Sequence, residues 1–234
     1  MIALQRSRFL TMLLILTVLS SIALRTFPAS AQPNYSPGVK PGDSITYGEF
    51  SINGTTPYPP FPPNTTSLKL TVQTVNSQTN NVNASLVYTF KNGTQSTQNL
   101  SGNTVTGEGN LFPYLVAANL TAGDLLFNSP YPYYPYLFNA TVGRVYAGAL
   151  RSVNLFNLTF TSYGQTGRAL FYWDVRTGLL LDAAETVSQS LVTNSSFSLH
   201  FRATETNVWT PDTSPLFGVR AMLHRTHVSQ FQYL

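Results

Sequence analysis

The stretch Val82–Lys91, VNASLVYTFK, decides the fold class. Every second side chain from Val82 to Phe90 is apolar or aromatic, whereas Asn83, Ser85 and Thr89 between them are polar. A period of two is typical of a strand that has one face in the core and the other in water. The stretch therefore predicts a half-buried strand of an antiparallel sheet.

Turn signals on both sides of this stretch predict two hairpins. Asn92-Gly93 is a dipeptide that favours tight two-residue turns, and it leads into a strand expected at Thr94–Leu100. On the other side, the polar residues 78–81 connect the stretch to a strand expected at Ser67–Val75.

The alternating pattern continues through most of the chain, with one segment, Leu111–Phe127, where a short helix competes until Gly123-Asp124 interrupts it. The further strands are expected at Ser44–Ile52, Val142–Ala149, Ser152–Ser162, Ala169–Asp174, Leu179–Val187 and Phe197–Trp209. We therefore expect an all-β or β-rich α+β protein. It should form a single curved antiparallel sheet or half-barrel of about eight strands, with a short helix or loops over the concave face.

The composition excludes several classes of protein. Hydrophobic residues make up 43% of the 234 residues and charged residues only 9%, against about 25% charged residues in ordinary soluble proteins. Such a chain can form a core, so charged disorder is excluded, and it lacks the Glu, Lys and Arg that flank a coiled-coil seam. The formal charge of +4 belongs to the ends of the chain, because three arginines precede residue 32 and Arg220 and Arg225 lie near the C-terminus. Nothing in the near-neutral middle indicates nucleic-acid binding.

The N-terminus has the three-part layout of an export signal. Arg6 and Arg8 precede an apolar run from Phe9 to Leu24, and Ala29-Ser30-Ala31 supplies the small residues that a signal peptidase requires. We expect cleavage after Ala31; the alternative is an uncleaved anchor, although the run is shorter than the ~20 residues of a membrane span. The chain has no cysteine, so no disulfide or lipidated cysteine is expected.

Three parts of the chain follow from these signals: a signal peptide over 1–31, a single β-rich extracellular domain over 32–214, and a tail over 215–234. The domain has two inserts rich in proline and aromatic residues, at 57–63 and 130–138. Basic and histidine side chains interrupt the tail, so we expect no transmembrane span in the mature chain. The expected location is secreted, associated with the cell surface.

Asn-x-Ser/Thr sequons are dense in the expected extracellular domain, and with an export signal in front they predict N-glycosylation. A glycan must point into solvent, and Asn83 falls on the polar side of its strand. The sequons lie at Asn53, Asn64, Asn83, Asn92, Asn99, Asn119, Asn139, Asn157 and Asn194.

Aromatic side chains gather in the two proline-rich inserts, where proline stiffens the backbone and lowers the entropy lost on binding. One interpretation is a rigid platform that contacts sugars or a neighbouring surface protein. The other, which we favour, is that these loops fold over the sheet and fill its core. The candidate contact residues are Tyr58, Phe61, Tyr131, Tyr133, Tyr134, Tyr136 and Phe138.

Three stretches carry a resemblance to known proteins: Tyr172–Leu181 (YWDVRTGLLL), Gly143–Gly148 (GRVYAG) and Val39–Gly48 (VKPGDSITYG). Together they resemble uncharacterised archaeal cell-surface proteins. The aromatic-Asp hairpin with its Thr-Gly turn is also similar to the LolA and LppX lipoprotein-carrier fold. That resemblance spans about residues 38–210, and it implies a half-barrel whose concave face binds acyl chains beneath a helical lid. The chain departs from these carriers in its weak helical signals for a lid.

Paired carboxylates are the first candidate for catalysis. Asp174 and Asp182 flank a predicted turn and face each other across a hairpin, as paired acids of a hydrolase do. The favoured interpretation is structural: Asp174 accepts backbone hydrogen bonds at the turn and Asp182 ends a strand.

Histidines give two weaker candidates. On one predicted strand His200 and Arg202 share a face and Glu205 takes the other, which favours a cross-strand polar patch over an acid–base pair. His224 and His227 have a spacing that suits a metal on a helix, but no third ligand is near, so no metal is expected. No Gly-x-Ser-x-Gly elbow or phosphate-binding glycine loop occurs.

These observations lead to one main hypothesis and two alternatives. The main hypothesis is a secreted, N-glycosylated, non-catalytic protein of the cell envelope, with a structural or interaction role and no cofactor. Its partners would be cell-envelope proteins or glycans. The first alternative is a carrier of a lipid or another hydrophobic ligand in a half-barrel cavity, and the second is an extracellular hydrolase.

Overall fold

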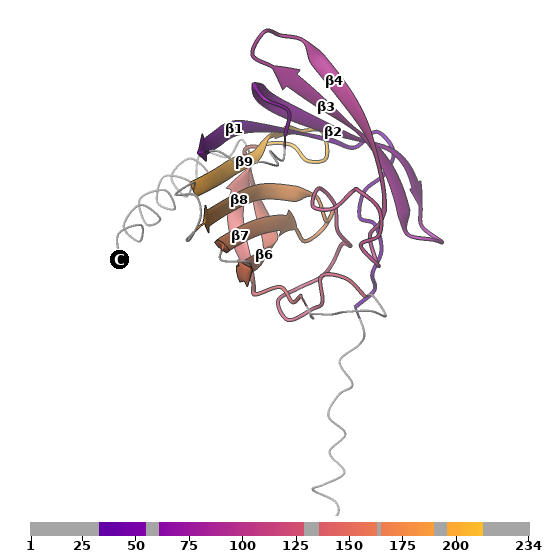
Figure 1. The fold of residues 1–234 in the computed structure, drawn as a ribbon. Helices are drawn as coiled ribbons and strands as arrows, with labels where there is room; N and C mark the ends of the chain where they lie inside the picture. The colour runs from indigo at the N-terminus through magenta and orange to yellow at the C-terminus, as the bar shows by residue number, and fades with distance from the viewer. Residues whose placement is uncertain (1–32, 55–60, 129–135, 163–164, 190–195, 213–234) are drawn as a thin grey trace, which may run out of the picture. The chain divides into compact units, whose positions relative to one another are not determined.

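The computed structural model describes residues 33–54, 61–128, 136–162, 165–189 and 196–212. Nine strands within these residues form one antiparallel sheet in the order β4-β3-β2-β1-β9-β8-β7-β6-β5 (Figure 1). The strands are β1 (Ser44–Gly54), β2 (Thr65–Asn76), β3 (Asn81–Phe90), β4 (Gln95–Asn103), β5 (Ala140–Tyr146), β6 (Ala149–Ser162), β7 (Gln165–Asp174), β8 (Leu180–Gln189) and β9 (Ser196–Thr206).

The sheet consists of two runs of sequential hairpins, β1–β4 and β5–β9, which meet where β1 pairs with β9. At this junction Tyr47 lies opposite Ala203, and bulges shift the register on both sides of Tyr47 and Gly48. The prediction of an all-β protein with one antiparallel sheet is confirmed. The sheet is open, with β4 and β5 at the two ends of its strand order.

The alternation in β3 behaves as the sequence predicts. Leu86 is fully buried and pairs with Leu70 of β2, whereas Asn83 is exposed. The buried side chains of β1, β2, β3 and β9 lie on one face, called here the inner face; the opposite face is the outer face. The inner face forms the hydrophobic core, with Ile45, Leu68 and Leu86 fully excluded from solvent.

Irregular chain between β4 and β5 covers the inner face. The indole Nε1 of Trp173 on β7 donates to the carbonyl oxygen of Pro113 at 2.7 Å, and Asn154 Nδ2 on β6 donates to that of Leu120 at 2.7 Å. The Trp173 ring is fully buried and has Phe138 of the covering segment 5.9 Å away. Loops therefore cover this face, one of the two coverings expected from sequence.

The competing helix in 111–127 does not form. The backbone N–H of Val116 donates to the carbonyl of Gly178 at 3.0 Å, and the N–H of Leu180 donates to that of Tyr114 at 2.9 Å. Because these backbone groups form hydrogen bonds with the β7–β8 turn, they cannot also form the i to i−4 hydrogen bonds of a helix. None of the described residues forms a helix of the length and apolarity that a bilayer crossing requires.

Candidate functional site

The outer face of β8 and β9 carries a buried carboxylate with two hydrogen-bond partners. Asp182 is 9% exposed. Its Oδ1 lies 2.9 Å from Nε2 of His200 on β9, and its Oδ2 accepts from the hydroxyl of Tyr146 on β5 at 3.2 Å. We call Asp182, Tyr146, His200, Arg202 and Glu49 the Asp182 cluster. It is the cross-strand polar patch that the sequence favours.

The Asp182 cluster holds its histidine toward the charged form. The hydrogen bond that Asp182 accepts from the His200 ring raises the pKa of His200 above its ordinary 6.5, against the opposing effect of partial burial. Arg202 lowers this pKa and Glu49 raises it, both through charge alone. Burial and the Asp182 charge also raise the pKa of Tyr146, so its hydroxyl stays protonated and donates.

Arg202 connects the Asp182 cluster to its neighbouring strands. Its Nη2 donates to the carbonyl oxygen of Val145 at 2.8 Å, its Nε lies 3.9 Å from a Glu49 carboxylate oxygen, and its guanidinium stands 4.9 Å from the Tyr146 ring centroid. Such contacts of arginine with an aromatic face are stabilising. The end of β5 therefore lies against β9, although the two strands are not neighbours in the sheet.

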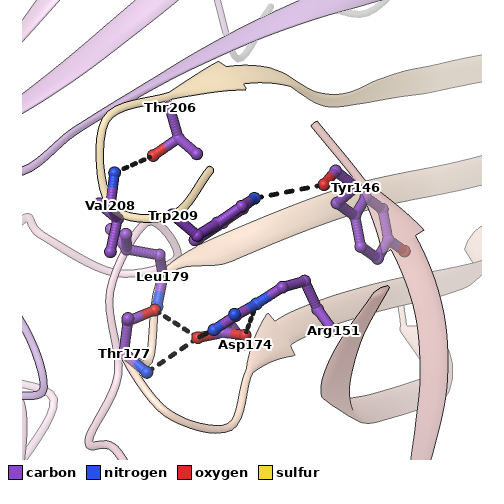
Figure 2. A network of polar contacts seen from close by, with 8 residues as sticks. All are labelled: Tyr146, Arg151, Asp174, Thr177, Leu179, Thr206, Val208 and Trp209. Atoms are coloured by element: carbon purple, nitrogen blue, oxygen red, sulfur yellow. Dashed lines mark hydrogen bonds and ion pairs between the residues drawn. The ribbon is translucent and has the colours of Figure 1, made fainter. Parts of the chain in front are cut away.

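A second polar group closes the β7–β8 turn (Figure 2). Asp174 accepts from the backbone N–H and the hydroxyl of Thr177, at 2.9 and 2.8 Å, and binds Arg151 of β6 through two hydrogen bonds. The Arg151 guanidinium lies 4.5 Å from the Trp209 ring, whose indole N–H donates to the carbonyl of Tyr146 at 3.4 Å. The structural interpretation of Asp174 as a turn residue is confirmed.

The two aspartates have separate partners, so the structure shows no shared catalytic pair. Asp182 does not end a strand, because it lies within β8 opposite Tyr172 and Arg202. Glu205 is exposed and lies opposite Thr46 of β1. The prediction that Asp182 ends a strand is therefore wrong. Asp174 and Asp182 each make hydrogen bonds to their own neighbours.

The Asp182 cluster contains some, but not all, of the groups that acid–base catalysis of a nucleophilic attack requires. An imidazole hydrogen-bonded to a buried carboxylate is half of a nucleophile-activating triad. Ser51 lies opposite His200 in the β1–β9 register, but its Oγ accepts from Asn53 Nδ2 at 3.1 Å. Within the described chain, no hydroxyl group is hydrogen-bonded to the His200 ring.

A groove of about 400 Å³ lies on the outer face, next to the Asp182 cluster. One row of cross-strand partners runs through it: Thr159 of β6, Arg168 of β7, Thr186 of β8, Ser198 of β9 and Asn53 of β1. We call it the hydroxyl groove because short hydroxyl side chains dominate its lining. The lining residues are Asn53, Thr159, Thr166, Gly167, Arg168, Thr186, Val187, Ser188, Ser196, Phe197 and Ser198.

The candidate aromatic residues that the structure describes divide between core and surface. Phe61 and Phe138 are buried, and Phe61 packs edge-on against Phe201 at 5.3 Å. Tyr136 is 41% exposed and touches Phe156 at 5.7 Å. The remaining candidates, Tyr58, Tyr131, Tyr133 and Tyr134, lie outside the described residues.

The sequon asparagines lie at the surface. In the described parts of the chain they are all exposed except Asn157, which is half-buried and accepts from Arg168 Nε at 3.1 Å. A further sequon, Asn34-Tyr35-Ser36, escaped the sequence analysis and is also exposed at its asparagine. Asn194 lies outside the described residues, as do the expected signal peptide, His224 and His227.

Sequence reasoning missed Tyr146, Arg151 and Trp209. Arg144, Tyr146 and Arg151 alternate toward one face of the β5–β6 hairpin, a pattern that could have indicated a polar and aromatic outer surface. No pattern indicated that Trp209, past the end of β9, would lie beside Arg151.

No three His, Cys, Asp or Glu side chains of the described residues come close enough to hold a metal ion. No protein-family model matches the chain, and no curated protein is similar enough to count as a relative.

Proposed function

We infer that the chain is an exported, N-glycosylated, non-catalytic protein of the cell envelope, with a structural or interaction role. The observation that supports this most is the exposure of the sequon asparagines on strands, turns and loops alike. A glycan is bulky and hydrophilic, so an acceptor needs an open surface. Asn64, Asn92, Asn99 and Asn119 meet that condition at four separate places in the fold.

The filled inner face favours a structural role over a carrier of hydrophobic ligands. A carrier needs an apolar cavity of ~300–1,000 Å³ open to its ligand. Here the Tyr47 ring on the inner face packs against both Phe201 and Tyr114 of the covering segment, and Trp173 contacts Phe138.

The intact mass of protein purified from its own host tests the proposal. We expect a chain beginning at Gln32 that carries glycan masses. Replacing Asn92 with Gln should remove one glycan increment, whereas Asn81→Gln, at an exposed asparagine outside any sequon, should remove none. An unmodified product that keeps residues 1–31 would contradict the proposal. A lipid that co-purifies in native mass spectrometry would favour the carrier instead.

A further inference from the structure

The hydroxyl groove presents a row of hydrogen-bonding side chains to a ligand. Its central row, Thr159–Arg168–Thr186–Ser198–Asn53, crosses five adjacent strands in register, so the side chains stand side by side on one face. All of these side chains except Arg168 are short, and the short side chains leave room above the sheet. The volume of about 400 Å³ falls within the usual size of ligand sites, ~300–1,000 Å³.

The lining chemistry matches a carbohydrate. Serine and threonine hydroxyls both donate and accept hydrogen bonds, as sugar hydroxyls do. Arg168 uses its Nε on Asn157 Oδ1 and has further N–H donors on its guanidinium.

One end of the row is itself a sequon residue. Asn53 begins Asn53-Gly54-Thr55, is exposed and lines the groove. We propose that the hydroxyl groove binds the first sugars of the glycan attached to Asn53. This inference rests on the proposed function, because it requires the chain to be glycosylated. A tethered sugar is present at high effective concentration, so a few hydrogen bonds suffice to hold it.

The contact is tested by removing one groove hydroxyl with and without the glycan. Thr186→Val keeps the shape of the side chain and deletes its hydroxyl. In glycosylated protein from the native host we expect it to lower the Tm by about 2–4 °C relative to the parent. In protein made without glycans the same change should leave the Tm unaltered. Thr97→Val, at an exposed position on β4 outside the groove, is the matched control and should have no glycan-dependent effect.

Peptide mapping of the same preparation separates the possible failures. An unmodified Asn53 with glycans on other sequons overturns the groove inference and leaves the proposed function standing. Equal effects of Thr186→Val in both forms, with Asn53 modified, also overturn only the groove inference. An absence of glycans from every sequon overturns both.

Discussion

Arg151 of β6 and Asp174 at the end of β7 are joined by two hydrogen bonds, from Nε to Oδ1 at 2.8 Å and from Nη2 to Oδ2 at 3.0 Å. The Asp174 side chain is 1% exposed and that of Arg151 16%. Asp174 also accepts from the backbone N–H and hydroxyl of Thr177, so this forked pair joins β6 to the β7–β8 turn.

Replacing Arg151 should therefore destabilise the fold strongly. Arg151→Ala leaves Asp174 buried without its counter-charge, and we expect a loss of about 3–5 kcal/mol in the free energy of unfolding measured with urea. The free energy of unfolding of Arg151→Lys should fall between those of the parent and Arg151→Ala, because an ammonium keeps the charge but cannot form two parallel hydrogen bonds to the carboxylate. Arg168→Ala removes an exposed arginine and should cost less than ~1 kcal/mol. Equal losses in the alanine variants would contradict the role of the Arg151–Asp174 pair.

The Asp182–His200 hydrogen bond predicts a pH-dependent stability. The folded protein holds the His200 proton more tightly than the unfolded chain does, because the pKa of His200 is raised. The resulting stabilisation is fully present below pH 6.5, the ordinary histidine pKa, and is lost as the pH rises through the folded pKa. His200→Gln should flatten this fall in urea-unfolding curves taken from acid to mildly alkaline pH. A His200→Gln variant with the parent's full pH dependence would assign the effect elsewhere.

Tyr47 and Tyr88 give opposite predictions for the same chemical change. Tyr47 is fully buried and its hydroxyl has no hydrogen-bond partner among the described residues. Tyr47→Phe should raise the free energy of unfolding by about 1 kcal/mol, because an unsatisfied buried hydroxyl is costly. Tyr88 donates to Gln98 Oε1 at 2.7 Å, so Tyr88→Phe should lower it by ~0.5–1.5 kcal/mol. Thermal or urea unfolding measures both, and a loss of stability in Tyr47→Phe would contradict the first prediction.

Two neighbours on β3 test the orientation of the sheet. Leu86→Asp places a carboxylate without a partner in the core and should abolish cooperative unfolding. Asn83→Asp adds the same charge on the exposed face and should keep the parent's far-UV circular dichroism and a Tm close to the parent's. A folded Leu86→Asp protein would mean that the faces of β3 have been exchanged.

Gly178 and Gly93 separate backbone strain from steric contact. Both have a positive φ, +74° and +81°, but a Cβ at Gly178 would lie 2.1 Å from the Val116 carbonyl oxygen, whereas one at Gly93 meets nothing within 4 Å. Gly93→Ala should cost about 1–2 kcal/mol from the left-handed backbone alone. Gly178→Ala must in addition displace the covering segment, so its loss of unfolding free energy should be clearly larger. Similar losses would show that the cover is free to move away from the turn.

The local part of the fold could be predicted from sequence, because the alternation of apolar and polar residues along a strand shows which face is buried. The alternation around Leu86 was enough to predict its strand, and the dipeptide Asn92-Gly93 was enough to predict the turn that follows. The strand expected at Val142–Ala149 instead breaks at Ala147-Gly148, where both residues take positive φ. Alanine seldom adopts that conformation, so no sequence signal marked the turn.

A polar patch around His200 and Arg202 could be predicted, but its partners from other strands depend on long-range register and could not. Tyr146 meets Asp182 across 36 residues, and Arg202 meets Val145 across 57. These residues are far apart in the sequence and come into contact only when β5 packs against β9. The hydroxyl groove was equally hidden, since Thr186 and Ser198 resemble any other solvent-facing residues of a strand until the pairing places them in one row.

The strand order leaves β4 as an edge of the sheet, and a foreign strand could add along it, except near Ser101 and Asn103, whose main-chain groups bond to Asn110 and Glu108. Along β4 the exposed side chains are polar, and Asn99 stands in the middle of this edge. An oligosaccharide attached to Asn99 would keep a second polypeptide away from this edge, and it would therefore oppose the edge-to-edge association of copies into fibrils.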